Sequence, residues 1–183
     1  MKHVIIGIGA AGITAAKTLR ELRPEDEIVM LSVDETPHSR CMLHKYLGHE
    51  RTAESLNFVP EDFFEKNHIW QIPGYRMNGL DTGKKKVYYG DGLICDYDKL
   101  LIATGAESFI PPVGALRTAP NVFGLLHLQD AIAIDECAKD AEKVVIIGSG
   151  LVGLDAASGL LEQGKKITIV EMAERILPIQ LDE

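Results

Sequence analysis

Two glycine-rich motifs with the same spacing are the residues of this sequence best suited to chemistry. Both have the pattern GxGxxG, with glycines at Gly7, Gly9, Gly12, Gly148, Gly150 and Gly153. Between a strand and a helix, the first glycine permits a tight turn, the second lets the backbone approach a pyrophosphate, and the third lets helix and strand pack closely. The free N–H groups at the helix N-terminus then bind the phosphates. Each motif therefore predicts a dinucleotide-binding turn.

An acidic residue follows the second predicted strand after each motif. Glu171 comes directly after the strand Lys166–Val170, and Asp34 lies a little beyond the strand Glu27–Leu31. A carboxylate in this position accepts hydrogen bonds from ribose hydroxyls, and it repels a 2′-phosphate. We therefore expect Glu171 to favour NADH over NADPH. For Asp34, the alternative is an ordinary loop carboxylate.

An internal repeat defines the elements that position these residues. Residues 2–19 and 143–160 are identical at ten of eighteen positions. In each copy a short apolar run predicts a buried strand, Val4–Ile6 in the first and Val144–Ile147 in the second. A helix with apolar residues on one face follows the glycines in both copies. We expect an α/β fold with two Rossmann-like dinucleotide-binding units, the second of them truncated.

The chain between the two motifs predicts shorter elements. Residues 61–66 continue a helical pattern, and residues 70–89 form short strands separated by glycine-rich turns. Residues 96–105 predict a buried strand that ends in a turn of small residues. A short helix is expected over residues 130–141.

Composition and charge exclude several other functions. The 27 acidic and 19 basic residues give a formal net charge of −8, which argues against binding nucleic acid or an anionic membrane. No apolar run has the length of a membrane-spanning helix, and the N-terminus enters a strand pattern without a signal peptide. Cys41, Cys95 and Cys137 are too widely spaced for a zinc site or a disulfide framework, so no metal is expected. These features predict a cytoplasmic protein.

Four segments together resemble the pyridine nucleotide-disulfide oxidoreductases, a family of flavoprotein reductases with two dinucleotide-binding domains. The segments are residues 7–12, residues 97–106, residues 148–153 and Glu171. In that family the first unit binds FAD, the second binds NAD(P)H, and a turn like that at residues 103–105 lies along the flavin. The resemblance thus implies an oxidoreductase that passes electrons from NADH through FAD to an acceptor.

The same resemblance implies which residues contact the cofactors. Those expected to bind FAD are Gly7, Gly9, Ala10, Ala11, Gly12, Asp34, Arg40, Lys45, Met77, Ala103, Thr104 and Gly105. Those expected to bind NADH are Gly148, Gly150, Gly153 and Glu171. Met77 matches a position whose backbone contacts the adenine in relatives, and its alternative is an ordinary strand residue. His38 stands where relatives often have an aromatic residue, and we expect it to cover the flavin or adenine.

The electron acceptor depends on residues 37–47. Ferredoxin, rubredoxin and nitrite reductase-type relatives have a pattern like R-P-x-L-S-K here, and Arg40, Leu43 and Lys45 match it. Cys41 stands at its proline position and His44 at its serine position. In those relatives the lysine approaches the flavin N5 edge and pairs with a glutamate, whose position is Asp155 in this chain. The resemblance therefore implies a catalytic Lys45–Asp155 contact and an electron-carrier protein as acceptor. The alternative for Asp155 is an acid that stabilises the first turn of its helix.

Cys41 supports a second interpretation of the same stretch. NADH oxidases, peroxidases and coenzyme A-disulfide reductases have one redox cysteine in a pattern like S-x-x-C-G-x-P-Y, and Cys41 falls at that cysteine. Met42 and His44 replace its glycine and proline. Nearby cationic residues could lower the pKa of this thiol and make it a nucleophile toward a small-molecule oxidant, or the thiol is inert. A third interpretation is a non-catalytic or inactive FAD-binding fragment.

The domain organisation follows from the same comparison. We expect an incomplete FAD-binding domain over residues 1–112, a connector over 113–142 and the first βαβ of an NADH-binding domain over 143–183. Family members continue beyond this point and return to the FAD domain. A lone βαβ leaves a sheet edge uncovered, and formation of a homodimer is one way to protect it.

Overall fold

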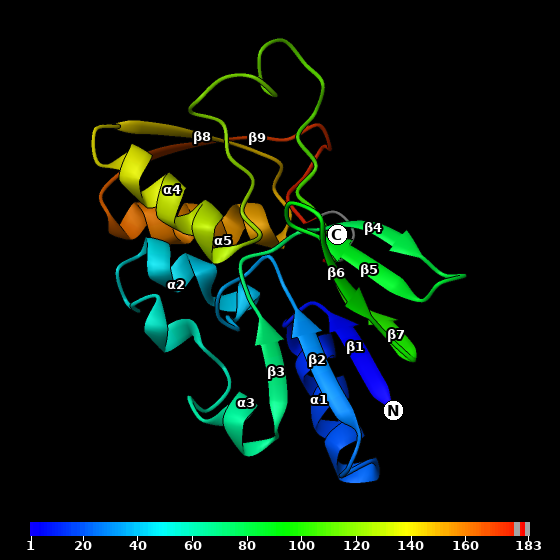
Figure 1. Cartoon of the computed structure of the whole chain (residues 1–183). Coiled ribbons are helices and arrows are strands. Elements are labelled where there is room, and N and C mark those ends of the chain that lie inside the picture. The colour runs from blue at the N-terminus through cyan, green and yellow to red at the C-terminus, as the bar shows by residue number, and fades with distance from the viewer. Residues whose placement is uncertain (178–179, 182–183) are drawn as a thin grey trace. The chain divides into compact units, whose positions relative to one another are not determined.

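The computed structural model describes residues 1–177 and 180–181 (Figure 1). It contains two compact units, each built from two stretches of chain. The first unit comprises Met1–His38 and Asn57–Ala106, and the second comprises Ser39–Leu56 and Glu107–Glu183. The boundaries predicted from the sequence are those of an FAD-binding and an NADH-binding domain, and they stay a prediction. No helix in the described part of the chain has both the length and the hydropathy to cross a lipid bilayer.

The first unit is built on a four-stranded parallel sheet in the order β3-β2-β1-β7. Its strands are β1 (Lys2–Ile6), β2 (Glu27–Leu31), β3 (Ile69–Ile72) and β7 (Lys99–Ile102). Strand β1, which precedes the first glycine motif, and strand β2, which follows the helix after it, confirm the two strands predicted there. Val4 and Ile5 at the centre of β1 are fully buried, as the continuous apolar run predicts for a parallel strand covered on both faces.

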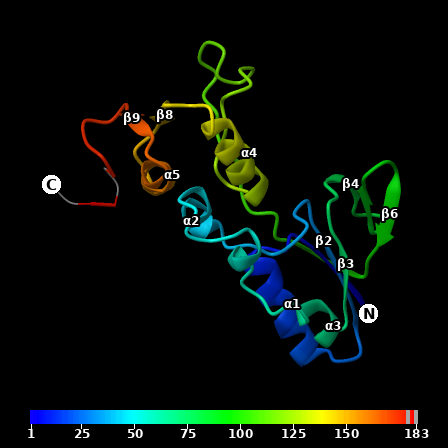
Figure 2. The ribbon, with the colours of Figure 1, turned by 90° about the vertical axis from the view of Figure 1, so that its left-hand side faces the viewer.

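Two layers cover this sheet. Helices α1 (Ala10–Leu22) and α3 (Phe63–Lys66) lie on one face and form a core with β1, β2 and β3. The other face packs on a three-stranded antiparallel sheet, and the two layers flank the main sheet in Figure 2. That second sheet consists of β4 (Met77–Asp81), β5 (Lys86–Tyr89) and β6 (Leu93–Asp96). The short strands predicted in this region are therefore confirmed.

The expectation of a buried strand over residues 96–105 is wrong. The strand β7 does form, but Leu101 and Ile102 are 41% and 53% exposed. The physical reason is its place in the sheet, because β7 is an edge strand of the described sheet and pairs only with β1. The apolar core on the α1 face draws its strand residues from β1, β2 and β3 and does not extend to β7.

The second unit combines a parallel strand pair with a small group of helices. The pair is β8 (Lys143–Ile147) and β9 (Lys166–Val170), joined by α5 (Leu151–Glu162). The other elements are the 3₁₀ turns η1 (Arg40–Met42) and η2 (Glu54–Leu56) and the helices α2 (Leu43–Leu47) and α4 (Leu128–Ala138). Leu43, Leu47, Leu56 and Ala131 form its buried core. The predicted βαβ after the second glycine motif is confirmed.

Helices α2 and α5 cross at a position that only glycine can occupy. A Cβ on Gly159 would overlap the carbonyl oxygen of His44 and lie 2.9 Å from the Cβ of Leu47. The two helices are also joined by Gln163 Nε2, which donates to Leu47 O at 2.5 Å. Close backbone approach thus fixes α2 against α5, even though α2 is only five residues long.

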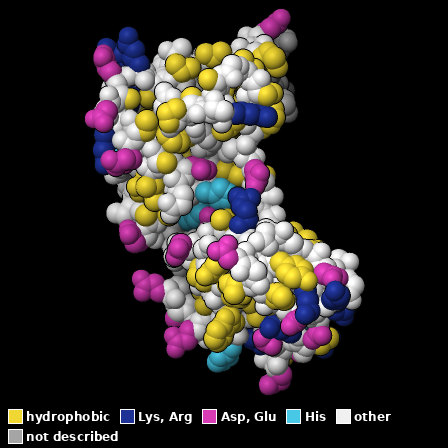
Figure 3. Space-filling view, turned by 45° about the horizontal axis from the view of Figure 1, so that its top comes forward, with side chains coloured by type: hydrophobic (Ala, Val, Ile, Leu, Met, Phe, Trp, Pro, Cys, Tyr) yellow, Lys and Arg dark blue, Asp and Glu magenta, His cyan; other side chains and the backbone are white. Residues whose placement is uncertain are grey.

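The expectation that Val144–Ile147 forms a buried strand is also wrong. Val145 and Ile147 of β8 are 62% and 54% exposed, and Val170 of β9 is 52% exposed on the same face. Hydrophobic side chains are visible on the surface in this region (Figure 3). The cause is that α5 packs on the other face of a sheet with only two strands. The apolar run of β8 has the same sequence pattern as β1, but β8 lacks the two layers that bury β1.

Candidate functional site

The first glycine motif forms a tight turn between β1 and α1. Gly7 has φ +112°, and a Cβ there would overlap the carbonyl oxygen of Ala103. A Cβ on Gly12 would overlap the carbonyl oxygen of Gly7. Gly9 is different: its φ is an ordinary −72°, and apart from Gly9 and its two chain neighbours no heavy atom of the described residues lies within 4 Å of a Cβ placed on it. Two of these glycines are therefore required by the fold, whereas the middle glycine borders open space at the N-terminus of α1.

The second motif repeats this geometry between β8 and α5. Gly148 has φ +102°, and a Cβ on Gly153 would overlap the carbonyl oxygen of Gly148. Gly150 has φ −72°, and its Cβ position is likewise free of neighbours within 4 Å in the described chain. An N-terminal helix end beside open space is where a phosphate fits, because unpaired N–H groups and the helix dipole both attract an anion. Both turns thus have the shape that a dinucleotide diphosphate needs.

Glu171 is held at the second turn by four hydrogen bonds. Its Oε2 accepts from the backbone N–H and the hydroxyl of Ser149, both at 2.7 Å. Its Oε1 accepts from the N–H groups of Met172 at 2.7 Å and Ala173 at 2.9 Å. These bonds, with that of Ala173 first, lower the pKa of Glu171 from 4.5 to about 2. The sequence-based expectation did not include Ser149, whose only signal was a hydroxyl inside a glycine turn.

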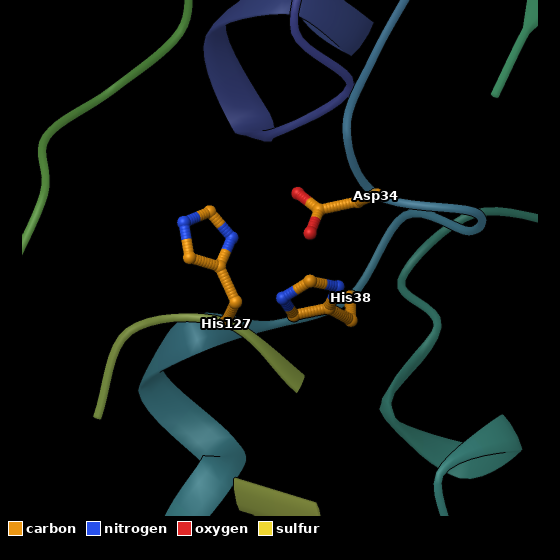
Figure 4. Close-up of side chains that lie close together, drawn as sticks. All are labelled: Asp34, His38 and His127. Carbon is orange, nitrogen blue, oxygen red and sulfur yellow. The ribbon is translucent and has the colours of Figure 1, made fainter. Parts of the chain in front are cut away.

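Asp34 and His38 lie on the loop that follows β2. Their side chains point to the same side of that loop in Figure 4, and a carboxylate oxygen of Asp34 lies within 4.8 Å of a ring nitrogen of His38. Asp34 is partly buried, and its N–H donates to the hydroxyl of Ser32 at 3.0 Å. His38 is buried, with Nδ1 3.3 Å from the carbonyl oxygen of Thr36. The roles expected of these two residues stay predictions.

The turn after β7 lies beside the first glycine motif. The N–H of Ala103 donates to Ile6 O at 2.8 Å, and its carbonyl oxygen faces Gly7. Thr104 is exposed, and Gly105 has φ +74°, which glycine adopts without strain. The sequence motif predicted to lie along the flavin is therefore next to the turn predicted to bind its diphosphate.

Met77 lies at the start of β4 and packs against the core that this sheet shares with β1 and β2. This contact accounts for its apolar side chain, and its expected backbone contact with adenine stays a prediction. Cys95 is buried in β6, and burial raises the pKa of its thiol, as expected of a structural cysteine.

Lys45 and Asp155 do not form the expected pair. Lys45 Nζ instead bonds both carboxylate oxygens of Glu50, at 2.8 and 2.9 Å. The basic side chain that approaches Asp155 Oδ2 is His44, whose Nδ1 lies 3.9 Å away. The physical reason is the phase of α2: His44 faces α5, and the next residue is rotated by about 100° around the helix axis. The sequence motif of the relatives predicts which residue types stand here, but it does not predict this rotation of α2.

His44 and Cys41 depart from the patterns of relatives, and each has a distinct environment. His44 Nδ1 is buried and has no hydrogen-bond partner among the described residues. Cys41 is exposed within η1, next to the partly buried Arg40. The catalytic roles expected of Cys41, Lys45 and Asp155, and the cofactor contact expected of Arg40, stay predictions.

Comparison with known proteins identifies the family. Residues 1–183 match the family described as pyridine nucleotide-disulphide oxidoreductase. An NADH oxidase of Methanocaldococcus jannaschii is 32% identical over 100% of this chain and 42% of its own length. A rubredoxin-NAD(+) reductase of Alcanivorax borkumensis is 33% identical over 98% of this chain and 47% of its own length. This chain therefore spans less than half the length of these relatives.

Solved structures give the same result for the fold. An NAD-dependent persulfide reductase from A. fulgidus superposes with a TM-score of 0.91 at 31% identity, covering 100% of this chain and 36% of that one. The putidaredoxin reductase in a covalent complex with putidaredoxin gives 0.85 at 30% identity, over 97% of this chain and 43% of that one. The expected α/β dinucleotide-binding fold is confirmed. The chain belongs to the pyridine nucleotide-disulphide oxidoreductase family.

Proposed function

We propose that this chain is the cofactor-binding part of an NADH-dependent FAD oxidoreductase that delivers electrons to an electron-carrier protein. The observation that carries the proposal is the open space beside Gly9 and Gly150. Both residues have backbone angles that any amino acid adopts, so the fold itself does not require glycine there. A bound diphosphate that approaches the backbone closely accounts for glycine at both positions.

Each unit would hold one cofactor through its own residues. In the first unit, the N–H groups at the start of α1 would bind the FAD diphosphate, and Asp34 would accept hydrogen bonds from its ribose. In the second unit, the start of α5 and Glu171 would bind NADH in the same way. When bound, NADH would supply a hydride and FAD would accept it.

Two relatives support an electron-carrier protein as the acceptor. The rubredoxin-NAD(+) reductase at 33% identity and the putidaredoxin reductase captured with putidaredoxin at 30% identity are both named for such a partner. In this chain Lys45 would supply positive charge at the flavin once it leaves Glu50, because its pair with Glu50 is exposed and therefore weak. We also retain, as parts of this proposal, the cytoplasmic location and the homodimer that the sequence suggests.

The visible absorption spectrum of the purified chain, mixed with FAD and desalted, tests the proposal. We expect the two bands of oxidised protein-bound flavin, and we expect anaerobic addition of NADH to bleach them. A protein that stays colourless would contradict FAD binding by this chain. A coloured protein that NADH does not bleach would favour the alternative of a non-catalytic FAD-binding module.

A thiol enzyme is the second candidate, and the exposure of Cys41 favours it. Its substrate would be a disulfide, a peroxide or an oxygen-derived oxidant. Replacement Cys41→Ser separates the two enzymes. The carrier-protein reductase should retain its NADH-dependent turnover with a one-electron acceptor, whereas a thiol enzyme should lose turnover of its oxidant. Cys137, exposed on α4, provides a matched control as Cys137→Ser.

A further inference from the structure

The carboxylate of Glu171 has no acceptor site left for a ligand. A carboxylate offers about four lone-pair sites. The N–H and hydroxyl of Ser149 and the N–H groups of Met172 and Ala173 donate four hydrogen bonds to it. A ribose hydroxyl can therefore reach this carboxylate only by replacing one of these donors.

Of these four donors, the hydroxyl of Ser149 is the one that can move without the main chain. The other three are backbone N–H groups, which can leave Glu171 only if the main chain moves. The hydroxyl of Ser149 needs only a rotation about χ1 to leave Glu171. In the first turn the equivalent residue is Ile8, which has no side-chain donor, so this arrangement belongs to the second unit alone.

We propose that the Ser149 hydroxyl gates the second unit by occupying the site on Glu171 that a ribose 2′-hydroxyl must take. The inference rests on the proposed binding of NADH by this unit and names the residue that sets its affinity. Binding exchanges one O–H···O⁻ hydrogen bond for another. The ribose therefore gains little from Glu171, and the nucleotide is held loosely enough to leave after each turnover.

Removal of the hydroxyl should tighten binding only for ligands that carry the 2′-hydroxyl. The experiment is calorimetric titration of the chain with ADP and with 2′-deoxy-ADP, in saturating FAD so that the first unit is occupied. The unmodified chain should bind the two ligands about equally. Ser149→Ala should bind ADP roughly ten-fold more tightly, since a hydrogen bond to a charged group no longer has to be broken. Its affinity for 2′-deoxy-ADP should not change.

Two variants complete the design. Ser158→Ala removes an exposed hydroxyl from α5 and should bind both ligands as the unmodified chain does. Ser149→Cys keeps the shape of the side chain, is somewhat larger and has a much weaker donor, so it should shift ADP binding in the same direction as Ser149→Ala. It provides the test if the alanine variant does not fold.

Each other outcome overturns the inference. If Ser149→Ala binds ADP equally well or more weakly, the hydroxyl supports Glu171 instead of competing for it. If both ligands tighten together, the effect does not pass through the 2′-hydroxyl. If the unmodified chain binds neither ADP nor NADH, the proposed nucleotide site of the second unit fails as well, which distinguishes that failure from a failure of the gate alone.

Discussion

Two charged side chains of the second unit are held by partners that the sequence motifs do not predict. Ser149 and the chain after β9 hold Glu171, and Glu50 holds Lys45. These two arrangements differ in strength. The bonds to Glu171 come from the backbone and a buried hydroxyl, whereas the Lys45–Glu50 pair is exposed and of a kind that contributes about 0–1 kcal/mol. Glu171 is thus fixed in place, and Lys45 is free to change partner.

The low pKa of Glu171 predicts a specific dependence of stability on pH. Because folding lowers this pKa from 4.5 to about 2, the ionised form stabilises the folded state. That contribution is complete above about pH 4.5 and is lost as the pH falls toward 2. We expect Glu171→Gln to lose less stability than the unmodified chain over this range, measured as the urea midpoint at successive pH values.

Glu174, exposed three residues farther along the chain, provides the control. Glu174→Gln should follow the unmodified chain at every pH. Parallel curves for Glu171→Gln and the unmodified chain would show that the four hydrogen bonds do not persist in solution.

At the scale of elements, the α2–α5 crossing determines where the residues near Asp155 lie. A methyl group on Gly159 would press on the backbone of His44. Gly159→Ala should therefore destabilise the chain by about 1–3 kcal/mol through overpacking, although alanine is the better helix former. The measurement is the free energy of unfolding in urea. Ser158→Ala, at the neighbouring exposed position, should change it by no more than about 0.5 kcal/mol. An equal effect of both substitutions would contradict the close crossing.

The internal repeat provides a second comparison between elements. Val4 in β1 and Val145 in β8 occupy equivalent positions, yet Val4 is fully buried and Val145 is 62% exposed. Val4→Ala should cost about 2 kcal/mol through lost burial and the cavity left behind. Val145→Ala should cost less than about 0.5 kcal/mol. Equal losses in the free energy of unfolding would show that another surface covers β8 in solution.

At the scale of the whole molecule, sequence reasoning succeeded where a feature depends on local pattern. The strands next to the two glycine motifs and the turns themselves follow from the sequence pattern. It failed where the answer depends on what lies beyond the element. The apolar runs of β1 and β8 are nearly identical, but only β1 lies between two layers. Likewise, the partner of Lys45 depends on the rotation of α2 against α5, which residue types do not encode.

The most direct test of the account is the affinity of FAD for Gly9→Asp. The Cβ position at Gly9 is open, and aspartate is a favourable residue at a helix N-cap, so the fold should be at least as stable as before. The carboxylate would occupy the site of the diphosphate and would repel its negative charge. We predict that FAD binding weakens by at least ten-fold, which corresponds to about 1.4 kcal/mol, with the circular dichroism spectrum unchanged. Gly9→Asn, which lacks the charge, should weaken binding less. A folded Gly9→Asp chain that binds FAD as the unmodified chain does would contradict the central claim that this space holds the cofactor.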